Sequence, residues 1–171
     1  MKKTITTLLT GLMFALIIML PMVNVAAAST NKSAPVNYNS YTTHQATATP
    51  TVMALALSTS NGSQTNLSLT VKVNEKFAVI GAIGAGTSTK SADPISGASI
   101  NILVSADQQK WASLGNFTSG TGQNGGLPKG VFGAGVTAPS SPGVYYLMAV
   151  FAGDGQYALS LSNVVTLTVT Q

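Results

Sequence analysis

Three features of the sequence predict an all-β domain. Beyond Thr51 it consists of short apolar runs separated by clusters of Gly, Pro, Asn and Ser, and no window shows a helical period. The longest apolar run after the N-terminal leader, Gly143 to Tyr157, is rich in β-branched and aromatic residues and lies between turn-forming residues. Strands at this spacing predict a two-sheet antiparallel β-sandwich of about seven to eight strands.

Eight strands follow from the apolar runs, and turn chemistry in the gaps supports their separation. Asn61-Gly62, Asp93-Pro94 and Gly153-Asp154-Gly155 are examples of such gaps. Val144–Phe151 is apolar on both alternating faces, so it is expected at the centre of a sheet. In chain order, the predicted strands are Val52–Leu57, Leu67–Val73, Phe77–Ile83, Ala98–Ser105, Trp111–Thr118, Val131–Thr137, Val144–Phe151 and Val164–Thr170.

Residues 1–28 have the pattern of a secretory signal peptide. Lys2 and Lys3 give a positive start, Leu8–Leu20 is apolar, and Ala26–Ala28 precede a cleavage site ahead of Ser29. An uncleaved anchor is the alternative, although a membrane span needs about 20 apolar residues. Residues 29–50, rich in Ser, Thr, Asn, Ala and Pro, predict a flexible linker. The β-sandwich then covers residues 51–171, and the expected location is secreted, extracellular or at the cell surface.

Charge and cysteine content exclude several classes of protein. Without the leader the chain has six lysines and four acidic residues, and no arginine, so the bidentate contacts favoured by specific nucleic-acid readers are absent. Nucleic acid is therefore not an expected partner. The chain has no cysteine, so its stability must come from the core rather than from disulfides.

The order of several motifs resembles a known family. Pro94-Ile95-Ser96-Gly97-Ala98, then Pro142-Gly143-Val144-Tyr145, then Ala152-Gly153-Asp154-Gly155-Gln156-Tyr157 resemble the bacterial and archaeal Ig-like domains of secreted cell-surface and S-layer-associated proteins. The resemblance covers about 120 residues, nearly the whole predicted domain. It implies an Ig-like sandwich, but not a function, because this fold hosts many functions.

The resemblance also implies which side chains form the core. Tyr145, Leu147, Ala149 and Phe151 would point inward, with Tyr145 as a corner tyrosine whose hydroxyl bonds nearby backbone. The other strands would add Phe77, Val79, Ile83, Ile100, Ile102 and Val104 to the same core.

No arrangement of residues predicts catalysis, a cofactor or a metal. The only histidine, His44, lies in the predicted linker, so the domain lacks a histidine base for a catalytic triad. The four acidic residues, Glu75, Asp93, Asp107 and Asp154, lie in separate predicted turns and read as turn-forming and solubilising groups. The glycine-rich stretch 81–90 lacks the Gly-Lys-Ser/Thr order of a phosphate-binding loop. The chain is therefore not expected to be an enzyme.

Two further features leave alternatives open. Trp111 is expected to cap the core, although an exposed tryptophan could stack on a sugar ring. Four sequons predict possible N-glycosylation at Asn31, Asn61, Asn66 and Asn116, but a chain this rich in Asn, Ser and Thr gives roughly two or three by chance, so the count alone is no evidence.

The outward side of the central strand carries apolar residues where the family usually has Thr, Lys or Arg. In an Ig-type strand order its neighbours would be the strands Ala98–Ser105 and Val164–Thr170, which would present Leu103 and Val164 beside small polar residues, among them Ser99 and Asn101. Such a patch on a secreted sandwich predicts an interaction site. The alternative is that the Trp111–Thr118 strand or the linker covers it. The expected face consists of Leu103, Tyr146, Met148, Val150 and Val164, together with Val144; Ala78, Ile80 and Ala82 form a smaller second candidate.

Three functions remain open. The favoured hypothesis is a non-catalytic secreted Ig-like module for adhesion or cell-envelope structure, with a cell-envelope protein or glycan, or a second copy, as partner. The second is a filament subunit in which residues 51–57 add as a strand to the next molecule. The third is a carbohydrate-binding module that uses Trp111, Tyr146 or Tyr157.

Overall fold

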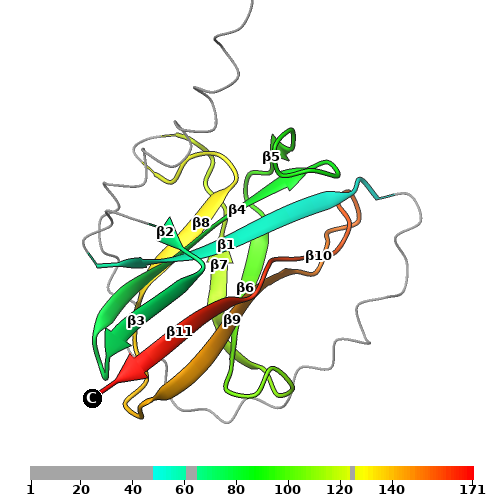
Figure 1. Ribbon diagram of the computed structural model, residues 1–171. Helices are drawn as coiled ribbons and strands as arrows, with labels where there is room; N and C mark the ends of the chain where they lie inside the picture. The colour runs from blue at the N-terminus through cyan, green and yellow to red at the C-terminus, as the bar shows by residue number, and fades with distance from the viewer. Residues whose placement is uncertain (1–47, 61–64, 124–125) are drawn as a thin grey trace, which may run out of the picture.

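The computed structural model describes residues 48–60, 65–123 and 126–171, and these form an all-β sandwich without a helix (Figure 1). The predicted fold class is therefore confirmed, and all eight predicted strands are present. Three strands of two residues, β2, β5 and β10, were not predicted. The strands are β1 (Thr51–Thr59), β2 (Thr65–Asn66), β3 (Ser68–Lys72), β4 (Lys76–Ala85), β5 (Asp93–Pro94), β6 (Ser99–Ser105), β7 (Ala112–Thr118), β8 (Val131–Thr137), β9 (Gly143–Phe151), β10 (Ser160–Leu161) and β11 (Val165–Thr170). Among the described residues there is no helix with the length and hydropathy of a membrane span.

The first sheet is built on β4. One edge of β4 pairs with β1 over nine residue positions, from Thr51↔Ala85 to Thr59↔Phe77. The other edge pairs with β8 and, at its end, with β5. β1, the strand considered above as a donor to another molecule, is thus paired along its whole length inside its own domain.

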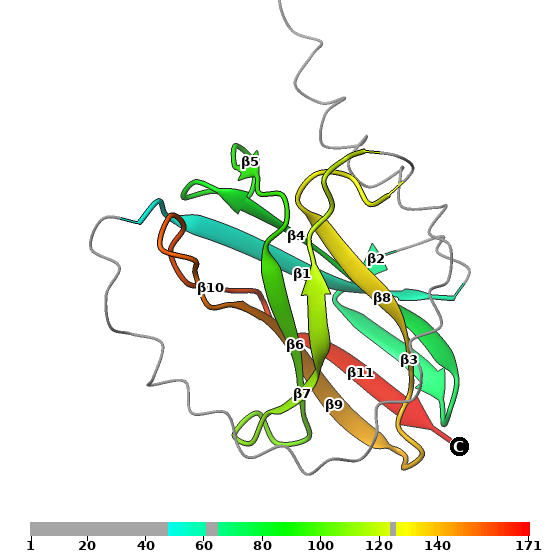
Figure 2. The ribbon, with the colours of Figure 1, turned by 180° about the vertical axis from the view of Figure 1, so that it is seen from behind.

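The second sheet has the order β3-β11-β9-β6-β7, so β9, the predicted central strand, lies between β6 and β11 as expected (Figures 1 and 2). One pair departs from the antiparallel expectation, because β3 runs parallel to β11. β10 and β11 pair with the same edge of β9, one after the other, and residues 162–164 form the break between them. In this break the Asn163 side chain bonds both the N–H and the C=O of Leu55 in β1, which links the two sheets.

The core between the sheets contains the side chains that the resemblance placed there. Leu147, Ala149 and Phe151 of β9 are buried in it with Phe77, Val79, Ile83, Ile100 and Ile102, while Val104 is partly buried against it. Tyr145 is also partly buried, and its hydroxyl donates to the Ser141 carbonyl at 3.0 Å, the bond expected of a corner tyrosine. Gly81 is required because a Cβ there would lie 2.3 Å from the ring of Phe132.

The chain enters the domain two residues before β1. Thr49, which the sequence placed in the linker, bridges to Tyr157 in parallel, with its N–H on the Gln156 carbonyl and its C=O accepting from Ala158 N–H. The predicted leader and the linker up to residue 47 lie outside the described residues, so the boundaries 1–28 and 29–50 remain predictions.

Candidate functional site

The expected apolar interaction face is not exposed. Leu103, Met148 and Val150 have 1%, 9% and 5% of their surface exposed, and they pack with Trp111 into a second apolar cluster on the outward side of the sheet. We call these four residues the outer cluster. Tyr146 is partly buried against it, and of the predicted face only Val144 and Val164 are exposed. The prediction of an exposed strip is therefore wrong for Leu103, Met148 and Val150. Of the alternative, cover by the Trp111–Thr118 strand or by the linker, the structure shows Trp111 packed on these residues, while the linker up to residue 47 lies outside the described residues.

The loop between β6 and β7 holds Trp111 on this face. Asp107 Oδ1 accepts the backbone N–H groups of Gln109 and Lys110, both at 2.8 Å, and the Ser105 hydroxyl at 3.0 Å. The Trp111 Nε1–H then donates to the Gln108 carbonyl at 3.2 Å. The Lys110 N–H, followed by Gln109 N–H and the Ser105 hydroxyl, lowers the pKa of Asp107 below its ordinary value. The turn is thus closed by an ionised carboxylate.

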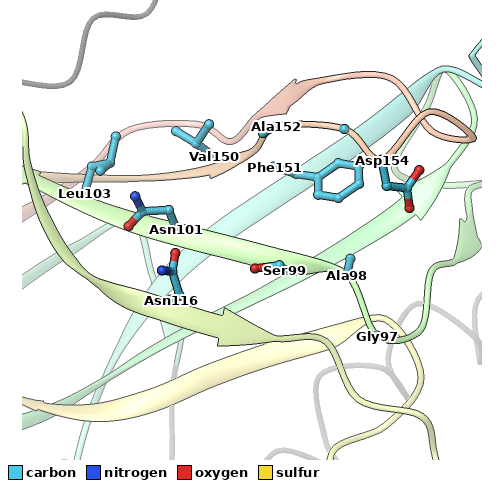
Figure 3. A pocket seen from close by; sticks show the side chains of 11 residues that line it. Gly97, Ala98, Ser99, Asn101, Leu103, Asn116, Val150, Phe151, Ala152 and Asp154 are labelled. Atoms are coloured by element: carbon cyan, nitrogen blue, oxygen red, sulfur yellow. The ribbon is translucent and has the colours of Figure 1, made fainter. Parts of the chain in front are cut away.

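A hollow of about 360 Å³ lies beside the outer cluster on the same outward face (Figure 3). Its volume falls within the range of about 300–1,000 Å³ typical of small-molecule sites. The exposed Ala152 supplies apolar surface next to the buried Leu103 and Val150, and β6, β7 and the segment after β9 supply polar groups. The lining residues are Gly97, Ala98, Ser99, Asn101, Leu103, Asn116, Val150, Phe151, Ala152, Gly153 and Asp154.

Two asparagines give the hollow its hydrogen-bonding character. Asn101 of β6 and Asn116 of β7 are directly paired across the two strands, and their amides lie side by side in Figure 3. Asn101 Oδ1 accepts the Ser113 hydroxyl at 2.7 Å, which orients its Nδ2 as a donor. Within the described part of the chain, Asn116 and Ser99 make no side-chain hydrogen bond that would occupy them. The hollow therefore offers donors and acceptors beside an apolar surface.

Asp154 forms the far wall of the hollow. Its Oδ1 accepts the backbone N–H groups of Gln156 at 3.0 Å and Tyr157 at 2.8 Å, so this oxygen belongs to the turn. Asp154 is the one ionisable side chain among the residues that line the hollow. Neutral polar groups and a single carboxylate suit an uncharged, hydroxylated ligand better than an anion.

Of the remaining predicted site residues, Asn116 lines the hollow, and the others do not line it or lie outside the described residues. Of the sequons, Asn66 is exposed on β2 and Asn116 is exposed on β7, while Asn31 and Asn61 lie outside the described residues, as does His44. Trp111 has only 9% of its surface exposed, so it presents no open ring for stacking on a sugar. Among the described residues, no three His, Cys, Asp or Glu side chains gather where they could hold a metal.

From the sequence alone, the polar residues of the hollow were expected to have other roles. Ser99 and Asn101 were only the rim of the apolar strip, Asn116 was a sequon and Asp154 a turn residue. The available signal was the hairpin itself, because strands 98–105 and 111–118 place Asn101 and Asn116 at facing positions once their register is known. That register is set by a bulge, which lies between Ile102 and Leu103 of β6 and opposite Gly115 of β7, whose φ is 152°. The bulge has no clear sequence signature.

Comparisons with known proteins add little. Neither the protein-family models nor the curated proteins contain a match to this chain. Among solved structures, the crystal structure of a chitin binding domain from Burkholderia pseudomallei is similar at a TM-score of 0.39 and 13% identity, covering 60% of this chain and 57% of that chain. The chain thus spans little more than half the length of that domain.

Proposed function

We propose that this protein is a non-catalytic, exported Ig-like module that binds a neutral glycan of the cell envelope in the hollow on the outward face of β6, β7 and β9. The observation that carries the proposal is the pair Asn101 and Asn116. Two side-by-side amides with free hydrogen-bonding groups lie in one concave site with the exposed Ala152 and the buried side chains of Leu103 and Val150.

This arrangement matches the chemistry of a sugar. A pyranose ring carries hydroxyls that both donate and accept at its edge, and C–H groups on its faces. Asparagine amides and the Ser99 hydroxyl can satisfy the first, while the exposed Ala152 can contact the second. Because the described residues that line the site include one carboxylate and no cation, it favours an uncharged sugar over a phosphorylated or acidic one.

The structure shifts the balance among the three earlier hypotheses. A protein partner docking on the apolar strip loses its basis, since Leu103, Met148 and Val150 are buried. A strand-exchange filament would have to separate β1 from β4 along nine paired positions. The carbohydrate-binding alternative keeps support, but through the asparagine pair rather than through Trp111.

The export of the module is part of the proposal and rests on the sequence. The signal-peptide pattern of residues 1–28 fits a secreted surface protein. A cell-surface glycan is the ligand class that such a location supplies.

The test is an NMR titration of the ¹⁵N-labelled domain with neutral oligosaccharides, one set with acetamido groups and one without. We expect saturable shifts of the side-chain amide signals of Asn101 and Asn116, with weak affinity in the range of about 0.1–1 mM. Asn101→Ala should abolish the shifts. Asn66→Ala, which removes an exposed asparagine from the other sheet, is the matched control and should leave them unchanged.

Two results would overturn the proposal. If neither oligosaccharide set moves the Asn101 and Asn116 signals, the hollow is not a glycan site. If the shift of the Asn116 side-chain signal persists in Asn101→Ala, the ligand binds elsewhere on the molecule.

A further inference from the structure

One loop joins the hollow to the N-terminal segment of the chain. The chain leaves β9 at Phe151, forms the hollow's wall at Gly153 and Asp154, and rejoins the sheet at Ser160, which pairs with Phe151. In Figure 1 this loop lies beside the beginning of β1. The same loop therefore serves two neighbours, the hollow on one side and the entering chain on the other.

The part of the loop that forms the wall is a closed turn. Asp154 Oδ1 accepts from the N–H groups of Gln156 and Tyr157, and the Asp154 N–H donates to the Tyr157 carbonyl at 3.3 Å. Gly153 and Gly155 have φ values of 84° and 87°, a conformation that glycine adopts readily and other residues rarely adopt. Because residues 154–157 are closed by these three bonds, a displacement at Gln156 must be passed to Asp154.

The far side of this turn is bonded to the beginning of the domain. The Thr49 N–H donates to the Gln156 carbonyl at 2.9 Å, and the Ala158 N–H donates to the Thr49 carbonyl at 2.8 Å. The Thr51 hydroxyl donates to the Ala158 carbonyl at 2.8 Å, and the Ser160 hydroxyl donates to the Thr51 carbonyl at 3.3 Å. Four hydrogen bonds thus fix the loop to residues 49–51, just where the chain enters the domain.

We propose that Thr49 and Thr51 are positioning residues for the hollow: by clamping Gln156 and Ala158 they set the place of the Gly153–Asp154 wall. Seating of the N-terminal segment and occupation of the hollow then stabilise each other, because a coupling of this kind is reciprocal. The proposal gives the junction between linker and domain a role in ligand binding. It rests on the proposed function only for the ligand, since the clamp itself can be measured without one.

The experiment is amide hydrogen exchange and chemical-shift mapping by NMR on the exported chain, residues 29–171, without ligand. Thr49→Pro removes the N–H that bonds Gln156, and Thr51→Val removes the hydroxyl that bonds Ala158 while keeping the shape of the side chain. We expect the Ala158 amide to exchange about fivefold faster in each variant, the effect of one net hydrogen bond. The backbone signals of Gly153 and Asp154 should shift at the same time.

Thr59→Val is the matched control, because it makes the same change at the opposite end of β1. It should leave the Ala158, Gly153 and Asp154 signals as in the wild type. Faster exchange at Ala158 with unchanged Gly153 and Asp154 signals would overturn the proposal, because the clamp would then not reach the wall. Unchanged exchange at Ala158 in Thr51→Val would overturn it as well, and this variant keeps the strand intact if Thr49→Pro unfolds.

A final arm separates this proposal from the proposed function. With an oligosaccharide that moves the Asn101 and Asn116 signals, the Ala158 amide of the wild type should exchange more slowly when the sugar is bound, and Thr51→Val should bind it more weakly. If no oligosaccharide binds, the glycan proposal fails while the ligand-free measurements still decide whether the clamp positions the wall. If the sugar binds but Ala158 exchange and affinity stay constant, the coupling is refuted and the glycan site stands.

Discussion

Leu147 and Met148 are neighbours on β9, yet they belong to two different apolar clusters. Leu147 points into the main core between the sheets, where it packs with residues from both of them. Met148 points outward into the outer cluster, where Leu103 and Val150 come from its own sheet and Trp111 follows a loop. The same strand therefore has a core on each side, built in two different ways.

The difference shows what the alternation of apolar residues does and does not determine. Alternation decides which side chains share a face of a strand. Whether that face meets another sheet, a loop or solvent depends on residues distant in the sequence. On the inward side a whole sheet covers β9, whereas on the outward side one tryptophan held by the Asp107 turn contributes the cover.

The largest expected loss of stability comes from a substitution on the inward side of β9. Leu147→Ala leaves a cavity between two sheets that cannot both collapse onto it, so it should lower the free energy of unfolding by an amount in the upper half of the range of about 2–5 kcal/mol. Chemical denaturation measures this loss. Val144→Ala, on the same strand but exposed, is the control, and a comparable loss there would contradict the description of the core.

Met148→Ala should cost less, in the lower half of the same range, because the outer cluster has fewer members and lies at the surface. Since Trp111 is the only tryptophan, its emission reports on the outer cluster alone. We expect a red shift of the native-state emission in Met148→Ala and none in Leu147→Ala. Equal losses of stability with no change in emission would mean that the two clusters do not differ.

The Asp107 turn predicts an acid-sensitive step confined to the outer side. Because its pKa is lowered in the folded state, the ionised carboxylate stabilises the turn above the ordinary pKa of about 3.9, and this contribution is lost as pH falls through the lower folded value. The Trp111 emission should therefore change in that pH window before the sandwich unfolds. Asp107→Ala should show the altered Trp111 emission already at neutral pH. If the emission of this variant instead changes with pH as it does in the wild type, the acid-sensitive step belongs to another group.

The smallest expected effect concerns Ser58, a residue of β1 next to the core residue Leu57. Its side chain is fully buried, and its hydroxyl has no hydrogen-bond partner among the described residues. Ile80, a member of the smaller second candidate face, is also buried, with 5% of its surface exposed. Outward positions on the first sheet can therefore be buried too. Ser58→Ala removes an unpaired polar group, so stability should stay within about 0.5 kcal/mol of the wild type or increase. A loss of more than about 1 kcal/mol in chemical denaturation would indicate a hydrogen bond that the structure does not show.

The fold was largely predictable because its signals are local. Apolar runs and turn residues are each read within a few positions, and they predicted the eight longer strands. The Tyr145 corner and the place of β9 between β6 and β11 followed instead from the resemblance to Ig-like domains. β2, β5 and β10 are too short for a periodic signal, and the parallel pairing of β3 with β11 joins segments about 100 residues apart. Local patterns do not carry such information.

The site was less predictable, because the contacts that form it join residues distant in the sequence. The apolar residues of the outward face were identified, but their cover by Trp111 depends on the conformation of the loop 105–111. The hollow depends on the register of β6 with β7 and on the loop after β9, which places Asp154 near residues some fifty positions earlier in the chain. The facing asparagines were visible as residues but not as a pair.

The most direct test of this account is the solvent accessibility of Trp111 in the native protein, measured by fluorescence quenching with acrylamide and iodide. The central claim is that Trp111 covers the outward face of β9 rather than leaving an apolar strip open. The account predicts weak quenching in the native state and strong quenching only after unfolding or in Asp107→Ala. Quenching of the native wild-type protein at the rate of a free tryptophan would contradict it, and would return the outward strip to its place as an exposed interaction face.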